Sequence, residues 1–338
     1  MKHGNLKTLK MFCSIVVILL LLLATAHISP VSAQEKTLSF GSGSVGATWY
    51  YAIGGFTQTI KNDLKGFNVS VRATGGSVEN LRLMPKNEID FAWAHAGNIY
   101  DAWNGVGIFD GKPKNKDFRM VARAYGSEHT IICLDDGKIR KLADLNGEKV
   151  QMGPPGSGTA VNTENIFKGL DLFDKIKPVY LNASDAVSAL GDGKIKGLGQ
   201  SAGPAASITS IATLKKIYMI PLTEAELQKI TDKYPFYSAG TVMSNMYPGN
   251  VPPTGIPSIW FQIYWIAHKD TPTDYVYETV KASFSEKNKP ALIKVHRYYE
   301  SLAPELDKMV GLKIPLHPGA EKFWKEQGLA IPAAISSK

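Results

Sequence analysis

The sequence predicts an α/β protein of two domains with a ligand cleft between them, and three observations support this prediction. Short apolar strands alternate with helical segments, which is typical of folds with largely parallel sheets. This alternation restarts at residue 149 after a first series. A long apolar strand at residues 257–267 then indicates a return of the chain to the first series. We therefore expect domain one at residues 34–130 and 255–338, domain two at residues 131–254, and a hinge made by the two crossing segments.

The individual elements follow from local residue patterns. Runs of β-branched and aromatic residues between turn residues predict strands at 37–40, 67–74, 89–94, 118–125, 129–134, 149–152, 178–181, 195–200, 217–220 and 257–267. Helical spacing of apolar residues predicts helices at 48–64, 76–84, 158–168, 184–190, 274–284, 290–299 and 320–327. Pro85 ends the second helix, and a cap by Ser184 or Asp185 begins the fourth. A Gly126-Ser127 turn is expected to separate the strands at 118–125 and 129–134.

The first 33 residues predict export. Three lysines and no acid precede a short apolar run at residues 15–26, and Val31-Ser32-Ala33 gives a small-x-small cleavage pattern. A membrane anchor is the alternative, but this run is clearly shorter than the ~20 apolar residues that a span needs. We therefore expect a signal peptide that is cleaved after Ala33 and a periplasmic mature protein.

Composition excludes some partners and a disulfide. The formal net charge is +8, but the lysines are scattered and no basic stripe with interleaved aromatics is present, which argues against nucleic acid. Cleavage would remove Cys13 and leave Cys133, within the apolar run at residues 130–134. We expect Cys133 to be a buried strand residue rather than a reactive thiol. A hydrophobic core, and not a disulfide, must then stabilise the fold.

Two glycine-rich motifs resemble nucleotide-binding loops but lack the residues that such loops need. Residues 41–46 have the G-x-G-x-x-G spacing, yet the next strand ends without the acid that would bind a ribose. Residues 153–160 resemble a P-loop, but Thr159 stands in the position of the lysine and Ala160 in that of the magnesium-binding hydroxyl. We therefore expect no nucleotide cofactor.

These motifs retain one physical property that suits a binding site. A glycine-rich turn that opens a helix presents backbone N–H groups at the positive end of the helix dipole, where anions bind. Such turns, all carrying hydroxyls, are turn 1 (residues 41–46), turn 2 (residues 74–77) and turn 3 (residues 156–159). Each alone is also explained as a tight strand-to-helix turn with a Ser or Thr cap. Their matching places in two α/β series favour a ligand at the carboxyl ends of the strands.

The sequence offers little for catalysis. Ser157 lacks the flanking glycines of a G-x-S-x-G nucleophile elbow. The histidines after residue 33 form neither an H-E-x-x-H motif nor a cluster with cysteine. His95 follows a strand at the expected rim of the cleft, where it is interpreted as a ligand contact, as a structural residue or as a catalytic residue. We therefore expect no enzyme and no metal site.

The three turns and their surroundings resemble the TAXI family, the solute-binding subunits of one branch of the tripartite ATP-independent periplasmic (TRAP) transporters. The matching segments are residues 41–51, 73–81 and 153–159, with weaker matches at 202–204 and 234–237. Two segments depart from the family pattern. His95-Ala96-Gly97 stands where many relatives have Gln-Ser-Asp, and residues 197–200 lack the acidic or aromatic residue that is common there.

The resemblance implies a two-lobed periplasmic binding protein of type II (Venus-flytrap), with a hinge and an interdomain ligand cleft. It also implies no cofactor and delivery of the ligand to TRAP membrane subunits. Family ligands are mostly dicarboxylates, amino acids and related anions, so we expect a small-molecule organic acid or amino acid. Alternatives are an exported binding protein that reports to a sensor and a secreted serine hydrolase that uses Ser157. The candidate ligand-binding residues are Ser42, Gly43, Ser44, Val45, Tyr50, Thr74, Gly75, Gly76, Ser77, Asn80, His95, Ala96, Ser157, Gly158, Thr159, Ala202 and Gly203.

Overall fold

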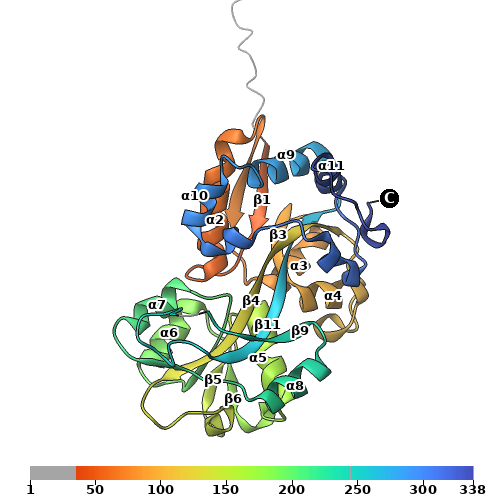
Figure 1. The fold of residues 1–338 in the computed structure, drawn as a ribbon. Coiled ribbons are helices and arrows are strands. Elements are labelled where there is room, and N and C mark those ends of the chain that lie inside the picture. Colours follow the sequence, from red (N-terminus) through yellow and green to blue (C-terminus); the bar gives the residue numbers. More distant parts are fainter. Residues whose placement is uncertain (1–35, 244, 338) are drawn as a thin grey trace, which may run out of the picture. The chain divides into compact units, whose positions relative to one another are not determined.

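A mixed sheet of eleven strands forms the centre of the described part of the chain (Figure 1). The computed structural model describes residues 36–243 and 245–337. The strands are β1 (Lys36–Gly41), β2 (Phe67–Arg72), β3 (Phe91–His95), β4 (Phe118–Leu134), β5 (Lys149–Gln151), β6 (Lys177–Val179), β7 (Gly197–Ser201), β8 (Ile217–Met219), β9 (Tyr237–Thr241), β10 (Asn250–Val251) and β11 (Pro257–His268). The predicted signal peptide lies outside the described residues.

The sheet is parallel toward its two ends and antiparallel in its middle. Its main order is β2-β1-β3-β11-β4-β7-β5-β6. Strand β1 is parallel to β3, and β5 is parallel to both β6 and β7. Strand β11 is antiparallel to β3, β4 and β9, and β4 is antiparallel to β7 and β8. The expectation of a largely parallel sheet therefore holds only near the two ends. The predicted domain boundaries near residues 130 and 255 stay a prediction.

The predicted turn at Gly126-Ser127 is wrong, because β4 runs without interruption from Phe118 to Leu134. Gly126 and Ser127 pair with Gln262 and Phe261 of β11. A β-carbon at position 126 would lie 2.9 Å from Nη2 of Arg123, so the glycine makes room for this guanidinium instead of bending the chain. Strands β4 and β11 consequently run side by side through the middle of the sheet (Figure 1).

Helices cover both ends of the sheet. They are α2 (Thr48–Ile60), α3 (Ser77–Leu83), α4 (Ala96–Asn104), α5 (Gly158–Gly169), α6 (Ala183–Gly191), α7 (Ala206–Ala212), α8 (Glu224–Lys233), α9 (Thr273–Ser283), α10 (Lys289–Val295) and α11 (Pro318–Glu326). Helix α2 packs on β2 and contacts α9 and α10, and α11 packs on α9 and β4. At the other end, α5 and α6 pack on β7, α7 contacts α6, and α8 contacts α5 and β9 (Figure 1).

Several predicted helix boundaries need correction. Helices α4, α7 and α8 and strands β9 and β10 were not predicted. The helix predicted at 290–299 ends at Val295, because His296 is extended and a separate 3₁₀ helix follows at Arg297–Ser301. The cap of α6 is Asn182, not Ser184 or Asp185, and it makes no side-chain capping bond.

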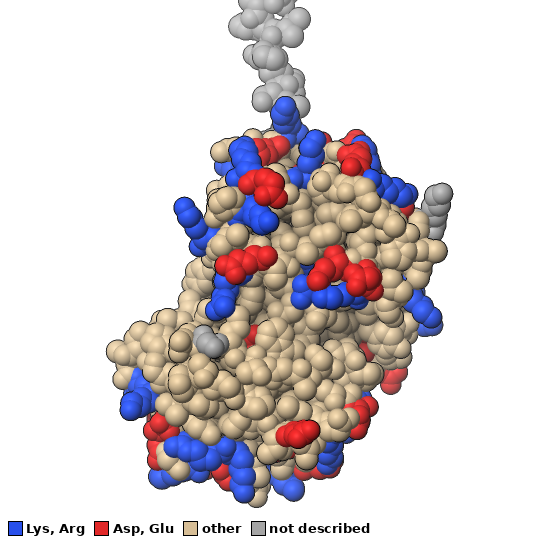
Figure 2. Space-filling model, in the orientation of Figure 1, with Lys and Arg blue, Asp and Glu red and all other residues tan. Residues whose placement is uncertain are grey.

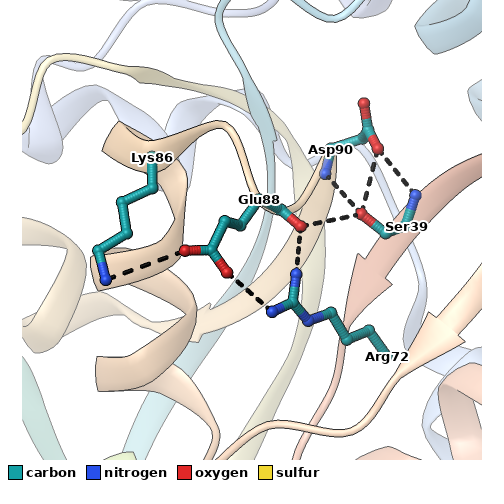
Figure 3. Close-up of polar contacts among 5 residues, drawn as sticks. All are labelled: Ser39, Arg72, Lys86, Glu88 and Asp90. Atoms are coloured by element: carbon teal, nitrogen blue, oxygen red, sulfur yellow. Dashed lines mark hydrogen bonds and ion pairs between the residues drawn. The ribbon is translucent and has the colours of Figure 1, made fainter.

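A polar network fixes the edge where β3 begins (Figure 3). Arg72, the last residue of β2, donates to the carboxylate of Glu88 at 2.9 Å and to its carbonyl at 2.5 Å. Lys86 lies 3.9 Å from the same carboxylate. The carboxylate of Asp90 accepts the N–H of Ser39 at 2.8 Å. These bonds join β1, β2 and the start of β3 and thereby hold the strand ends that carry turns 1 and 2.

The core is apolar and contains the cysteine predicted to be buried. Phe40 stacks on Trp265 with 5.6 Å between ring centroids and meets Phe91 edge-on, so β1, β3 and β11 share one aromatic cluster. Cys133 is a free, fully buried residue of β4, and burial raises the pKa of its thiol to about 12. The predicted strand cysteine is therefore confirmed.

The surface carries both signs of charge. Acidic and basic side chains are interspersed over the face drawn in Figure 2, consistent with the scattered lysines of the sequence. Within residues 36–243 and 245–337, no helix is long and apolar enough to cross a membrane.

Candidate ligand-binding site

The three glycine-rich turns meet at one place in the fold. Helix α3, which follows turn 2, contacts turn 3 through the backbone, since the N–H of Glu79 donates to the carbonyl of Gly156 at 2.9 Å. A β-carbon on Gly75 would overlap the carbonyl oxygen of Pro155, so only glycine permits this approach. Turn 1 joins turn 2 because the N–H of Thr74 donates to the carbonyl of Gly43 at 3.2 Å.

A cavity of about 60 Å³ lies between the turns. Its wall includes the first residues of α2 and α5 together with Ala183 of α6, so the N-terminal ends of three helices face it. The lining residues are Gly43, Ser44, Ala47, Thr48, Trp49, Gly75, Gly76, Ser77, His95, Gln151, Pro154, Ser157, Gly158, Thr159, Ala183, Ala186, Leu198, Gly199, Gln200, Ser201, Ala202, Ser207 and Ile208. The first N–H groups of an α-helix have no partner within the helix and are available to an acceptor.

Ten of the predicted site residues line this cavity. They are Gly43, Ser44, Gly75, Gly76, Ser77, His95, Ser157, Gly158, Thr159 and Ala202. The hydroxyl of Ser44 is buried and has no hydrogen-bond partner within the described residues. Ser157 caps α5, because its Oγ accepts the N–H of Ala160 at 3.0 Å. Ser77 serves the backbone in a similar way, since its Oγ accepts the N–H of His95 at 2.9 Å.

Three further predicted residues lie behind the wall and hold it. The hydroxyl of Ser42 donates to the carbonyl of Arg72 at 2.8 Å. Asn80 is fully buried and its amide donates to the carbonyls of Ser42 and Trp93 at 3.0 and 3.1 Å. The hydroxyl of Thr74 contacts the Asn80 amide oxygen at 2.7 Å. These side chains make their hydrogen bonds to other groups of the protein and not to a ligand. They thereby fix the backbone of turns 1 and 2.

The other four predicted residues lie apart from the cavity wall. Ala96 is buried at the start of α4, and the carbonyl of Gly203 accepts the hydroxyl of Tyr298. Val45 is 58 % exposed at the tip of turn 1. Tyr50 packs edge-on against Tyr51 beside a separate groove between α2 and β2.

His95 is the buried centre of the site. Its ring lies edge-on to Trp49 at 5.3 Å between centroids and against Phe261 at 4.4 Å. Burial lowers the pKa of His95 to about 3, so the ring is neutral at physiological pH. A β-carbon on Gly158 would overlap His95 Nδ1, which places turn 3 directly against this ring.

Sequence reasoning missed a set of buried polar residues beneath the cavity. Ser201 and Gln151 line the wall, while His129, Asn162 and Thr163 lie behind it. His129 Nδ1 lies 2.7 Å from Ser201 Oγ, and its Nε2 lies 3.1 Å from Thr163 Oγ1. Burial, with His95 nearby, lowers the pKa of His129 to about 3. The sequence signal that could have predicted these residues is the occurrence of polar residues inside apolar strands and on the inner face of a helix.

The cavity wall is almost free of ionisable side chains. Among the described lining residues, His95 is the sole titratable one, and it is neutral. Within the described residues, no group of three His, Cys, Asp or Glu side chains is placed to hold a metal ion. The available chemistry is therefore that of neutral hydrogen-bond donors and helix dipoles, which suits an anion.

The fold is similar to that of solved structures whose sequences differ widely from this one. A protein from Bordetella bronchiseptica RB50 has a TM-score of 0.52 at 12% identity, with 88% of this chain and 99% of that chain covered. A chain from a structure on glutathione import via GshT and the cystine ABC importer TcyBC of Streptococcus mutans has a TM-score of 0.50 at 12% identity, covering 82% of this chain and 100% of that chain. The predicted fold class, that of two-lobed periplasmic binding proteins, is confirmed.

Within this class the family is defined by sequence. Residues 40–328 match the NMT1-like family, and this chain belongs to that family. The match begins inside β1 and ends beyond α11, so it includes all three turns and the cavity that they line.

Proposed function

We propose that this protein is an exported solute-binding protein that captures a small organic anion and delivers it to a membrane permease. The observation that carries the proposal is the convergence of turns 1, 2 and 3 on one cavity with a neutral, hydroxyl-bearing wall. Membership of the NMT1-like family and the fold of periplasmic binding proteins support it. In this role the protein performs no chemistry and needs no cofactor.

The energetics require several donors at once. Micromolar capture needs about 8 kcal/mol of net binding free energy, whereas one helix N-terminus supplies at most ~2 kcal/mol. A hydrogen bond to a charged group contributes about 1.5–3 kcal/mol. The N-terminal ends of α2 and α5 together with the hydroxyls of Ser44 and Thr159 therefore reach the required range only if all act on one ligand.

A thermal-shift screen of the purified protein tests the binding role. The panel holds mono- and dicarboxylates, amino acids and uncharged sugars of similar size. A ligand at a hundred times its dissociation constant stabilises the fold by about 2.7 kcal/mol, which raises the melting temperature measurably. Stabilisation by carboxylates and not by sugars supports the proposal, whereas a panel without any response contradicts it.

The permease that we propose consists of TRAP membrane subunits, as the TAXI resemblance implies. The chain from the glutathione-import structure is named together with an ABC importer, so an ABC permease is the competing partner. A sensor protein is the third possibility. Cross-linking of the tagged protein in intact cells, followed by mass spectrometry of the membrane fraction, distinguishes the three. Recovery of ABC or sensor subunits in place of TRAP subunits would reject the proposed delivery.

A secreted hydrolase using Ser157 remains the alternative of a different class. Its nucleophile would need a base within hydrogen-bond reach. The hydroxyl oxygen of Ser157 instead accepts the N–H of Ala160, in a helix cap. Turnover of ester substrates that disappears in Ser157→Ala would favour the hydrolase.

A further inference from the structure

The buried polar residues beneath the cavity form a chain of hydrogen bonds, and the donor and the acceptor of each bond can be assigned. One end of the chain is Thr163. Its single hydroxyl proton is donated to the carbonyl of Met152 at 2.5 Å or to that of Thr159 at 2.9 Å. Toward His129 Nε2, at 3.1 Å, the Thr163 oxygen must therefore accept. His129 consequently carries its proton on Nε2, and its Nδ1 is a bare acceptor.

The direction continues to Asn162. Because His129 Nδ1 is bare, the hydroxyl of Ser201 donates to it at 2.7 Å. The Ser201 oxygen can then accept the amide N–H of Asn162 at 3.2 Å. The orientation of this amide agrees with its other end, where the hydroxyl of Tyr237 donates to Asn162 Oδ1 at 2.7 Å.

The chain ends at His95 in the cavity wall. The second amide proton of Asn162 points to His95 Nδ1 in a long hydrogen bond of 3.4 Å. His95 Nδ1 is therefore an acceptor, and the neutral ring carries its proton on Nε2. Nε2 has no hydrogen-bond partner among the residues that the structure describes, and the ring lines the cavity. His95 thus presents a donor, and not an acceptor, to a ligand.

We propose that the cavity selects a small carboxylate that lacks an ammonium group, with His95 Nε2–H as a neutral donor that determines this specificity. The inference rests on the proposed binding function and narrows its ligand class. An amino acid would bring an ammonium group into a wall that, among its described residues, offers no carboxylate. Burial of an unpaired charge is strongly unfavourable, so the amino group should be rejected while the carboxylate is held.

Calorimetry with matched ligands tests the selectivity. The pairs are pyruvate and L-alanine, succinate and L-aspartate, and 2-oxoglutarate and L-glutamate, whose members differ at the position of the ammonium group. The acid without ammonium should bind about thirtyfold or more tightly than its amino-acid partner. Equal or tighter binding of the amino acid would overturn the inference and leave the binding function intact. Failure of every acid and amino acid to bind would overturn both.

The role of His95 has its own readout. Long-range ¹H–¹⁵N spectra of histidine-labelled protein distinguish protonated from bare ring nitrogens, and the signals missing in His95→Gln identify His95. The expected spectrum shows Nε2 protonated and Nδ1 bare. The opposite tautomer would overturn the assignment, because Nδ1–H would then face the amide N–H of Asn162, which is also a donor. His95→Gln keeps an amide donor and should retain affinity within about threefold, whereas His95→Leu should lose tenfold or more.

Discussion

Gly158 lies directly against the ring of His95, so that a β-carbon at position 158 would overlap His95 Nδ1 and lie 2.8 Å from Asn98 Oδ1. Gly158 is the first residue of α5, and His95 is the last residue of β3. The contact therefore joins turn 3 to the strand that follows turn 2. Helix α5 can approach the cavity only because position 158 has no side chain.

Gly158→Ala tests whether this contact shapes the site. The added methyl group must displace the His95 ring or move α5, and such overpacking typically costs about 1–3 kcal/mol of unfolding free energy. We expect the affinity for a carboxylate ligand to fall at least about tenfold, measured by calorimetry. The matched control is Gly54→Ala in α2, where the new β-carbon would lie 3.9 Å from Val71. This variant should bind normally and be as stable or slightly more stable, because alanine favours a helix. Equal affinities for both variants would contradict the contact's role.

Alanine variants of two helix caps distinguish an effect on ligand binding from an effect on protein stability. Ser157 caps α5 at the cavity, and Thr223 caps α8 with its Oγ accepting the N–H of Glu226 at 3.3 Å. Each change to alanine should lower the unfolding free energy by about 1 kcal/mol, measured by urea denaturation. Ser157→Ala should also weaken ligand binding, because it loosens the first turn of α5 in the cavity wall. If Thr223→Ala weakened binding equally, the effect would be one of general stability.

The buried histidines make stability depend on pH. The pKa of His95 is about 3 in the folded protein, against 6.5 for an ordinary histidine. Below pH 6.5 the unfolded chain binds a proton that the folded chain does not, so the stability contributed above pH 6.5 is lost as pH falls toward 3. At pH 5 the loss for His95 alone is about 2 kcal/mol.

The measurement compares urea unfolding of the native chain and His95→Gln between pH 7.5 and 5. The native chain should lose the additional stability, and the variant should not. Glu128 acts in the opposite sense, because burial raises its pKa from 4.5 to about 7 and its contribution is lost as pH rises through that range. Glu128 is common to both chains and cancels in the difference. Parallel pH profiles would show that His95 titrates normally.

Cys133 gives an independent probe of β4. Its thiol is fully buried, and its pKa of about 12 leaves almost no thiolate near neutral pH. In a chain with Cys13→Ser, a thiol reagent at pH 8 should react with Cys133 only after denaturation. Rapid labelling of the native protein would mean that the centre of the sheet opens frequently.

Local sequence patterns were sufficient for much of the fold. Apolar runs and glycine-rich turns located β1, α2 and α5, because these elements begin and end through local backbone preferences. The turn predicted at Gly126 was wrong, because a glycine is required there by the nearby Arg123 guanidinium and not by a turn. The antiparallel middle of the sheet depends on pairing between β4 and β11, which no local pattern specifies.

The site also contains residues that local sequence patterns predict and residues that they do not. Turns 1, 2 and 3 were recognisable because hydroxyls and glycines are adjacent in the sequence. The hydrogen-bond chain from His95 to His129 was not recognisable in the sequence, because its members come from four separate elements and each looks like an isolated polar residue. Val45 and Tyr50 belong to a segment that matches the family pattern, yet neither lines the cavity. Val45 is exposed, and Tyr50 lies beside a different groove.

A crystal structure of the protein with the tightest-binding carboxylate from the screen would show whether the ligand lies between the three turns. We expect the carboxylate to lie within hydrogen-bond distance of the first N–H groups of α5 and of His95 Nε2, enclosed by turns 1 and 2. A ligand found instead in the groove beside Tyr50, with the cavity between the turns filled only by water, would contradict it.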